Sequence, residues 1–328
     1  MRKVSVIIVN WNGASLITQC LRSLVCQSYI PTEIILVDNG STDGSVSHVR
    51  AEFPSMKVVA LTENRGFATG NAAGLKVATG EFIALLNNDA HAGEKWLQNL
   101  IQPMLEDPRV GISAPKTLSI DGTKIDSAGG GLTTAGVGFN HSHGQNEDAC
   151  SDPGLIFGGC GAAALYRRRM VDEIGFLDDD FFLYDEDTDL SFRAQLAGWK
   201  CAYVPSAVVY HTSNATVGRL SDAHVYHHTR NLEFVWLKNM PAGLMFRFAH
   251  HKIFQEIGAF SYLCIRHRKW APYFRAKRDA IRMFSLMWNK RRVIQRRKRV
   301  SNAYLKGLMT PLFSRELILG KLKQFVNG

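Results

Sequence analysis

Residues 4–13, VSVIIVNWNG, combine an unbroken run of apolar side chains with an abrupt polar end. The run at 4–9 shows no apolar–polar alternation, which is typical of a strand buried on both faces. Comparable runs recur at 33–37, 57–61 and 82–86. Helical patterns lie between them, the first with Leu16, Cys20, Leu21 and Leu24 on one face and another at about 69–78. This order predicts a doubly wound α/β domain with a mostly parallel sheet.

The pattern changes in the second half of the chain. Residues 110–165 suggest short strands and glycine-rich turns added to the same sheet, followed by a helix at 185–197 and two strands at 201–204 and 207–210. Beyond about 230 the sequence becomes helical, basic and rich in aromatic residues. We therefore expect a domain at 1–230, with a nucleotide half at 1–110 and an acceptor half at 111–230, and a basic helical extension at 231–328.

Charge is distributed unevenly along the 328 residues. Residues 1–229 carry 17 Lys and Arg against 25 Asp and Glu, whereas residues 230–328 carry 22 against 4. A basic end on an acidic body suggests an anionic partner such as lipid headgroups, nucleic acid or a phosphorylated acceptor. The six cysteines form no C-x-x-C pair, which favours reduced thiols over disulfides or a zinc site.

Polar residues follow three of the predicted strands directly. They are Asn10-Trp11-Asn12-Gly13, then 38–44 (DNGSTDG), and then Asn87-Asn88-Asp89. Each loop alone could be an ordinary turn, with Asp43 capping the next helix. Because ligands bind at the carboxyl ends of parallel strands, three such loops at one edge point to a binding site.

Two common nucleotide-binding classes are excluded by their missing motifs. There is no G-x-G-x-x-G after the first strand and no G-x-x-x-x-G-K-[ST] in the chain. Side chains would hold a nucleotide instead, with Asp38 accepting from a ring N–H or a sugar hydroxyl and Trp11 packing on the base.

The motifs VSVIIVNWNG, VDNGSTDGS, NRGFATGN and LLNNDA, with the later block FFLYDEDTDLSFRAQLAGWKCAYVPSAVVYH, resemble family 2 glycosyltransferases with the A-type fold. The likeness covers roughly residues 3–240, and it is nearest to rhamnosyltransferase-type enzymes of bacterial surface polysaccharide assembly. It implies inverting transfer of a sugar, with rhamnose as the candidate, from a dTDP- or UDP-linked donor to a lipid-linked saccharide acceptor.

The resemblance also assigns donor and metal residues. The family's D-x-D motif falls on Asn87-Asn88-Asp89, so one carboxylate, Asp89, remains to bind Mg²⁺ or Mn²⁺ with the diphosphate. His211 is the second expected metal ligand, although a lone histidine at a strand end is often only a core residue. The expected donor-binding residues are Asn10, Trp11, Asn12, Asp38, Asn64, Arg65, Asn88 and Asp89.

Four acidic residues lie at the start of the helix expected at 185–197. Acidic residues there can simply favour the helix dipole. The resemblance places the catalytic pair on Glu186 and Asp187, with Asp187 as the general base that deprotonates the acceptor hydroxyl. Asp189 and Arg193, four residues apart, are expected on the acceptor side or paired with each other.

The basic end predicts peripheral attachment to an anionic membrane. The stretch 253–265 is too short to span a bilayer, and 290–299 (KRRVIQRRKR) is typical of a polybasic headgroup-binding segment. The apolar start is too short for a signal peptide. We expect a cytoplasmic protein on the inner face of the plasma membrane, with no nucleic-acid partner. The sequence leaves a homodimer open as an alternative to a monomer.

Two alternatives remain open at the level of the sequence. A nucleotidyltransferase has a similar nucleotide domain, but it would need a basic, glycine-rich phosphate loop after the first strand. Residues 10–15, which follow that strand, contain no Lys or Arg. A non-catalytic nucleotide-sugar-binding or membrane-scaffold protein is suggested by Asn87 and Asn88, whereas the intact Asp89, Asp187 and His211 oppose it.

Overall fold

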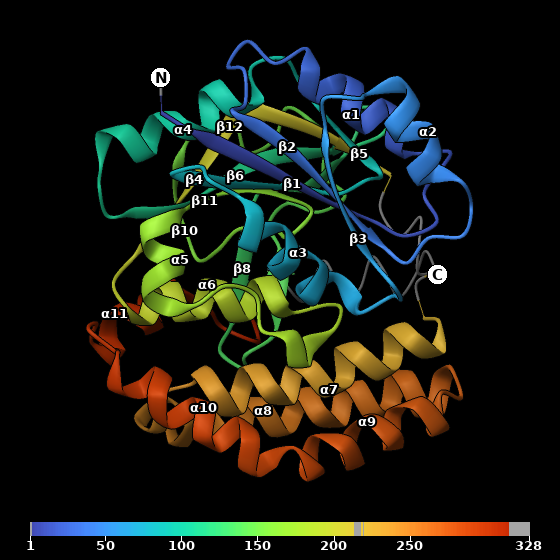
Figure 1. Ribbon diagram of the computed structural model, residues 1–328. Helices are drawn as coiled ribbons and strands as arrows, with labels where there is room; N and C mark the ends of the chain where they lie inside the picture. The colour runs from blue at the N-terminus through green and yellow to red at the C-terminus, as the bar shows by residue number, and fades with distance from the viewer. Residues whose placement is uncertain (1, 213–217, 219, 315–328) are drawn as a thin grey trace.

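A computed structural model describes residues 2–212, 218 and 220–314 (Figure 1). A ten-stranded sheet forms its centre, in the order β10-β12-β6-β11-β4-β1-β2-β3, with β5 paired to β12 and β7 to β6. Strands β1, β2, β3 and β4 are parallel, and β12 is parallel to β6. Strand β11 runs antiparallel between β4 and β6. The prediction of a doubly wound, mostly parallel sheet is confirmed.

The first half of the chain alternates strands and helices as expected. Its elements are β1 (Val4–Asn10), α1 (Ile17–Val25), β2 (Glu33–Asn39), α2 (Ser45–Glu52), β3 (Lys57–Leu61), α3 (Gly66–Val77), β4 (Phe82–Leu86), β5 (Ala90–Ala92) and α4 (Trp96–Glu106). The expected face of α1 is buried at Ile17, Cys20, Leu21 and Leu24. The helix predicted from residue 69 begins three residues earlier, at Gly66.

The second half adds short strands and then helices. Its elements are β6 (Val110–Ser119), β7 (Ile125–Ser127), β8 (Gly130–Thr133), β9 (Gly138–Asn140), β10 (Gly154–Ile156), β11 (Ala163–Arg167), α5 (Arg168–Ile174), the 3₁₀ turn η1 (Asp179–Phe181), α6 (Glu186–Leu196) and β12 (Lys200–His211). The two strands predicted at 201–204 and 207–210 are one strand, β12. An irregularity between Val204 and Val208 shifts its register against β6.

The last helices and a short strand complete the described chain. They are α7 (Asp222–Asn239), α8 (Ala242–Phe260), the π-helical segment η2 (Ser261–Arg266), α9 (Trp270–Arg282), α10 (Phe284–Arg296), α11 (Asn302–Leu308) and β13 (Met309–Thr310). Strand β13 joins β8 and β9 in a second, three-stranded sheet. Helix α7 begins at the cap Ser221, whose side chain accepts a hydrogen bond from the backbone N–H of His224.

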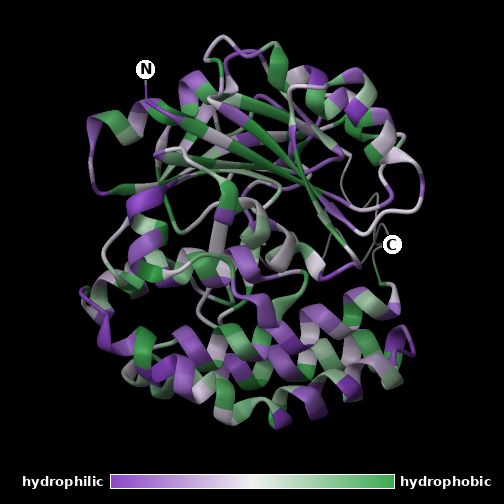
Figure 2. Cartoon of the chain, in the orientation of Figure 1, coloured by the Kyte–Doolittle hydropathy of each residue, from purple (hydrophilic) through white to green (hydrophobic). Residues whose placement is uncertain are grey.

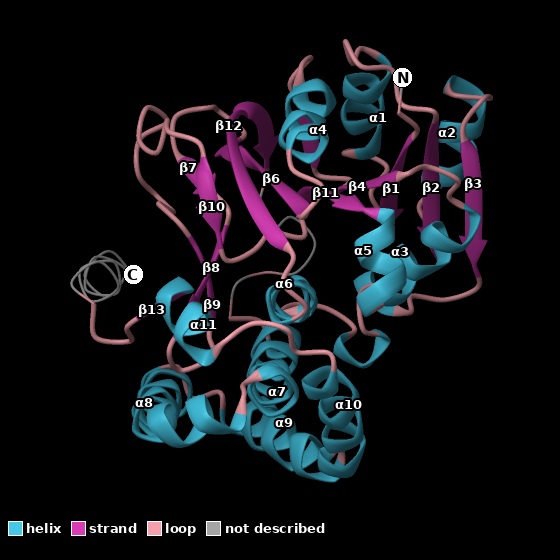
Figure 3. Cartoon of the chain, turned by 90° about the vertical axis from the view of Figure 1, so that its left-hand side faces the viewer, coloured by secondary structure: helices cyan, strands magenta, loops and turns pink. Residues whose placement is uncertain are grey.

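The molecule is layered (Figure 3). Helices α1, α2 and α4 pack on one face of the sheet and α3, α5 and α6 on the other. A further hydrophobic core joins α6 to the last helices through Phe192, Phe234, Leu244, Met287 and Leu305. The expected boundary at 230/231 falls inside α7, because the helical layer begins at Asp222. This layer packs on the acceptor half through a continuous core.

Two further findings concern membranes and thiols. No helix in the described parts of the chain is long and apolar enough to cross a bilayer. All six cysteines are free.

Candidate active site

Asn10 and Asn88 hold two loops together at the carboxyl edge of the sheet. Asn10 is fully buried at the end of β1. Its side-chain amide donates to the hydroxyl of Ser45 over 2.9 Å, and its carbonyl accepts from the Asn88 amide over 2.9 Å. Both ends of the Asn10 side chain are therefore occupied within the protein. The structure gives Asn10 a positioning role, beneath the surface that a donor would contact.

The loop after β1 is also bound to the loop after β2. The backbone N–H of Thr42 donates to the Asn12 side chain over 2.8 Å, and Asn12 has a φ of 51°. Asp38 is buried and accepts from the backbone N–H of Ser41 at 3.3 Å. Trp11 remains 38% exposed beside these groups. Its indole is thus presented at the sheet edge, where the sequence predicted that it would pack on a base.

Asn39, which the sequence analysis did not single out, organises the loop after β3. Its amide donates to the Asn64 side chain over 3.0 Å and to the carbonyl of Gly66 over 3.1 Å. Its oxygen accepts from the backbone N–H of Arg65 over 3.0 Å. Asn64 therefore supports the loop, while the Arg65 side chain is exposed at the start of α3.

Asp89, His211 and Asp126 form a chain of three side chains. His211 ends β12, and its Nε2 lies 3.1 Å from a carboxylate oxygen of Asp89. Its Nδ1 lies 2.9 Å from Asp126, which comes from β7. Burial alone would lower the pKa of His211, but the two carboxylates outweigh burial and raise this pKa to about 9. The structure thus brings together Asp89 and His211, which lie 122 residues apart.

This geometry fits a divalent cation. A histidine that binds a metal through one ring nitrogen commonly donates its other N–H to a carboxylate, as His211 does toward Asp126. The side-chain oxygen of the neighbouring Asn87 is buried without a hydrogen-bond partner. The described residues contain no group of three or more His, Cys, Asp or Glu side chains placed to hold a metal. Diphosphate and water oxygens would have to complete the coordination shell.

Asp187 lies near the start of α6 and is held by backbone groups. One carboxylate oxygen accepts from the N–H of Gly161 over 2.7 Å, and the other accepts from the N–H of Thr188 over 2.6 Å. Burial raises the pKa of Asp187, the bond from Gly161 acts against this, and the charge of Asp185 adds to the rise. An aspartate with a raised pKa is a stronger base than a solvated one.

Glu186, beside Asp187, is almost fully buried. One of its side-chain oxygens has no hydrogen-bond partner. Burial and then the charge of Asp187 hold the pKa of Glu186 well above its ordinary value. Beside the candidate base, burial therefore favours the neutral form of the Glu186 carboxyl more than it would be favoured in an exposed glutamate.

The segment before α6 has an unusual backbone. Phe182, Tyr184 and Asp185 all have positive φ, between 64° and 70°. This conformation is costly for residues with bulky side chains and needs support from its surroundings. The support comes from Asn231 of α7, whose amide donates to the carbonyls of Phe181, Leu183 and Tyr184 at 2.7–3.0 Å.

The same segment contacts helix α3, in the first half of the chain. The carbonyl of Phe182 accepts from the N–H of Phe67, in the first turn of α3, over 2.7 Å. Gly66 has a φ of 84°, and a Cβ added there would lie 2.5 Å from that carbonyl. Glycine is therefore required at position 66 by both its backbone and its neighbour.

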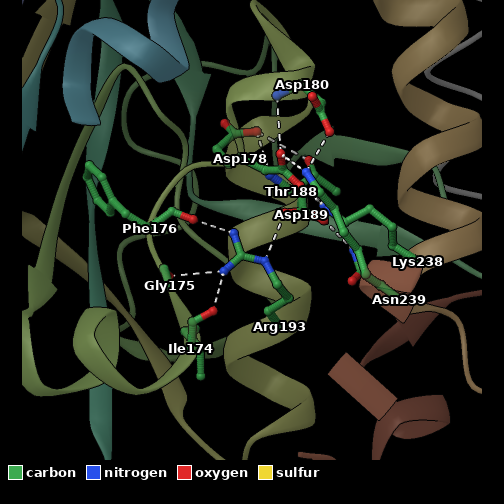
Figure 4. A network of polar contacts seen from close by, with 12 residues as sticks. Ile174, Gly175, Phe176, Asp178, Asp180, Thr188, Asp189, Arg193, Lys238 and Asn239 are labelled. Carbon is green, nitrogen blue, oxygen red and sulfur yellow. Dashed lines mark hydrogen bonds and ion pairs between the residues drawn. The ribbon is translucent and has the colours of Figure 1, made fainter. Parts of the chain in front are cut away.

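Asp189 and Arg193 are paired with each other, and both are buried. The guanidinium of Arg193 donates to Asp189 over 2.8 Å and to the carbonyls of Ile174, Gly175 and Phe176 (Figure 4). Asp189 is fully buried, and its other oxygen accepts from Lys238 and Asn239 of α7, both over 2.8 Å. The expected pairing of Asp189 with Arg193 is confirmed. Within the protein, Asp189 joins α6 to α7, and the expected place of the two residues on the acceptor side stays a prediction.

Comparisons with known proteins match this chain to one family and to several of its relatives. The family model for glycosyl transferase family 2 matches residues 5–175. An N-acetylglucosaminyl-diphospho-decaprenol L-rhamnosyltransferase of Mycobacterium tuberculosis is 26% identical over 73% of this chain and 85% of its own length. The succinoglycan biosynthesis protein ExoO of Rhizobium meliloti is 23% identical over 66% of this chain and 63% of its own length.

Solved structures share the fold. The mannosyltransferase PcManGT from Pyrobaculum calidifontis, in complex with GDP-Man and Mn²⁺, has a TM-score of 0.56 and 19% identity, covering 89% of this chain and 85% of that one. GalNAc-T7 with UDP, GalNAc and Mn²⁺ has a TM-score of 0.58 and 18% identity, covering 78% of this chain and 54% of that one. The family match spans more than half of the 328 residues, and the chain belongs to glycosyl transferase family 2.

Proposed function

We propose that this protein transfers a sugar from a nucleoside diphosphate to a hydroxyl of a lipid-linked saccharide, with inversion and with the help of Mg²⁺ or Mn²⁺. The observation that carries the proposal is the segment 160–162. The N–H of Gly161 donates to Asp187, and the carbonyl of Ala162 accepts from the N–H of Asn87 over 2.8 Å. The candidate base and the cation-binding loop are thus attached to the same three residues.

The cation-binding side chains are Asp89 and His211, with Asn87 as a further oxygen donor. A bound cation would neutralise charge on the departing diphosphate. Asp126 keeps His211 oriented, with Nε2 toward Asp89. Trp11 and Asp38 lie at the same sheet edge, where we propose that they bind the base and the nucleoside.

Asp187 performs the proton transfer in this proposal. The acceptor hydroxyl gives its proton to the Asp187 carboxylate as its oxygen bonds to the anomeric carbon, and the bond from that carbon to the diphosphate breaks. A single displacement by the acceptor oxygen, on the face opposite the departing diphosphate and assisted by the base, inverts the anomeric centre. Glu186 lies beside this base with one side-chain oxygen unpaired, and we propose that it binds a hydroxyl of the acceptor or the donor sugar.

The names of the relatives support a choice of substrates to propose. The mycobacterial relative is named for a rhamnosyl donor and for an acceptor on diphospho-decaprenol. We propose a dTDP-linked sugar such as rhamnose as the donor, with a UDP-linked hexose as the alternative to be compared. The proposed location is the cytoplasmic face of the plasma membrane, where a lipid-linked acceptor would be met.

Calorimetry with a panel of nucleotide sugars tests the proposal, with Mg²⁺, with Mn²⁺ and with EDTA. Cation-dependent binding of a thymidine or uridine diphosphate sugar is expected. Release of the nucleoside diphosphate should then require a saccharide acceptor, apart from slow hydrolysis. Failure to bind any nucleotide sugar under all three conditions would refute the proposal and favour the non-catalytic alternative.

A further inference from the structure

The helices farthest from the sheet expose an unusual amount of apolar surface. Of the 21 large hydrophobic side chains exposed in the described chain, 15 lie between residues 246 and 313. Figures 1 and 3 show α7, α8, α9 and α10 below the sheet, and in Figure 3 α8 and α10 flank α7 while α9 lies beneath it. Figure 2 shows that hydrophobic and hydrophilic residues are interspersed along these helices. Exposed apolar side chains that gather in one part of a molecule point to an interaction site there.

Helix α8 contributes a stripe along its length. Phe246, Ile253 and Ile257 follow each other at helical spacing and are 86%, 59% and 60% exposed. The exposed residues between and around them include only Arg247 and His250 as ionisable groups. The opposite side of α8 is anchored by Leu244 and Phe248, which are buried in the core shared with α7. The stripe therefore belongs to a firmly packed helix.

Helix α9 combines apolar and basic side chains on its outer surface. Trp270, Phe274 and Ile281 are exposed there. An open hollow on this helix is lined by Phe274 and Ile281 together with Arg275, Lys277 and Arg278. Trp270 stacks near Phe274, with ring centroids 6.2 Å apart. Aromatic rings beside cationic heads are suited to the boundary between acyl chains and lipid phosphates.

The charge around these helices selects the partner. Residues 242–308 carry 17 Lys and Arg and 2 Asp and Glu. Both acidic residues are neutralised internally: Glu256 pairs with Lys252 and Lys277, and Asp279 pairs with Arg278 and Arg282. An apolar surface surrounded by excess positive charge is complementary to an anionic bilayer. A second copy of this chain would bring the same positive charge against itself.

We propose that Phe246, Ile253, Ile257, Trp270, Phe274 and Ile281 form a membrane-docking face that seats the protein on anionic phospholipids. The apolar side chains enter the headgroup boundary and the arginines of α9 pair with phosphates. This inference deepens the proposed function by naming the surface that brings the protein to a lipid-linked acceptor, and it stands on its own observations.

The test is cosedimentation of the full-length protein with vesicles. Phosphatidylcholine vesicles containing phosphatidylglycerol are compared with vesicles of phosphatidylcholine alone. We expect binding only to the anionic vesicles, weakened by salt. The double variant Phe274→Ser/Ile281→Ser should lose at least about tenfold in vesicle affinity. Arg278→Gln/Arg282→Gln should lose affinity at low salt and show less salt dependence.

The matched control is Ile30→Ser/Leu155→Ser, which removes two equally exposed aliphatic side chains from the sheet half of the molecule. It should bind vesicles like the unchanged protein. Equal binding to neutral and anionic vesicles would overturn the proposal, as would full binding by the α9 double variant. Dimerisation abolished by that variant, without vesicle binding, would identify the face as a homodimer interface instead.

Transfer to a short-chain, water-soluble acceptor separates the two proposals. The α9 double variant should keep this activity in the absence of vesicles, which also shows that it is folded. If the unchanged protein binds anionic vesicles but shows no donor binding or transfer, the docking face stands and the proposed function fails. If transfer occurs without any binding to anionic vesicles, the proposed function stands and the docking face fails.

Discussion

The backbone N–H of Gly161 donates a 2.7 Å hydrogen bond to the carboxylate of Asp187, which lies 26 residues later in the chain. The glycine-rich segment thus orients the candidate base directly. A Cβ at position 161 would lie 3.3 Å from the same carboxylate oxygen, so a larger side chain would crowd it. This relationship explains why small residues precede β11.

Asp187→Asn should remove the base while keeping the shape of the side chain. We expect the rate of transfer to fall by at least about 100-fold, because general base catalysis contributes on this scale. Donor affinity, measured by calorimetry, should change little. Asp152→Asn, at an exposed position, is the matched control and should retain full activity. Turnover retained by Asp187→Asn would assign the proton transfer to another group.

The pH profile should reflect the raised pKa of Asp187. Transfer requires the deprotonated carboxylate, so activity should fall as the pH drops through this pKa. The acid limb of kcat/KM is therefore expected above the range of an ordinary aspartate, whose pKa is about 3.9. An acid limb at or below that range would contradict the role of burial. Glu186→Gln removes one neighbouring carboxyl, and the acid limb of its kcat/KM profile should be compared with that of the unchanged protein.

Asp126→Asn tests the orientation of His211. The variant weakens the acceptor of the Nδ1–H bond, and such changes behind a metal ligand commonly reduce metal affinity about 10- to 100-fold. Calorimetry should show this loss in the cation-dependent part of donor binding. Binding measured with EDTA should remain as in the unchanged protein. An unaltered dependence on Mg²⁺ or Mn²⁺ would remove His211 from the cation site.

Asn231→Ala tests support of the segment with left-handed residues. The carbonyls of Leu183 and Tyr184 lose their side-chain donor, whereas that of Phe181 keeps Arg230. Asp187 should therefore be displaced and kcat should fall about 10- to 100-fold, with the donor KM little changed. Asn289→Ala, on the exposed side of α10, is the matched control. If thermal stability falls while kcat is unchanged, the role of Asn231 is purely structural.

Asp189→Asn should destabilise the junction between α6 and α7. Removing one partner of a buried ion pair costs about 3–5 kcal/mol in the free energy of unfolding, because Lys238 and Arg193 stay buried. Denaturant titration should show this loss at neutral pH. Glu81→Gln, which breaks a solvent-exposed pair with Arg2, should have little effect.

At acid pH, the free energy of unfolding of Asp189→Asn should come closer to that of the unchanged protein. Burial acts to raise the pKa of Asp189, but Lys238 and Arg193 outweigh it and lower this pKa. A lowered pKa in the folded state stabilises the protein above the unfolded pKa of about 3.9. That contribution is lost as the pH falls through the folded-state pKa. A constant difference across acid pH would contradict this linkage.

The sequence predicted the elements whose signals are local. Strands 4–9, 33–37, 57–61 and 82–86 appear within two residues of their expected ends, because unbroken apolar runs need burial on both faces. The loops after β1, β2 and β4 meet at one edge because parallel strands place them there. Strand β12 was divided wrongly, since Pro205 and Ser206 resemble a turn while the strand continues through an irregularity.

Partners that meet only through the tertiary fold could not be predicted. Asp126 comes from a three-residue strand 85 residues before His211, and its segment carries no motif. Asn231 acts on carbonyls 47–50 residues away. Asp189 was expected near the acceptor because of its neighbours in the sequence, but the helix turns it toward α7. The spacing of residues along a helix shows which side chains lie on the same face, but it does not show which element packs against that face.

The contact between Gly66 and Phe182 sets a constraint on sequence variation. A side chain at position 66 would occupy space held by the carbonyl and the ring of Phe182. Residue 66 can therefore change only if the chain around 182 changes with it. Libraries that randomise the two positions separately should yield few folded members. Accepted replacements should arise in pairs, with one change at the start of α3 and the other in the segment before α6.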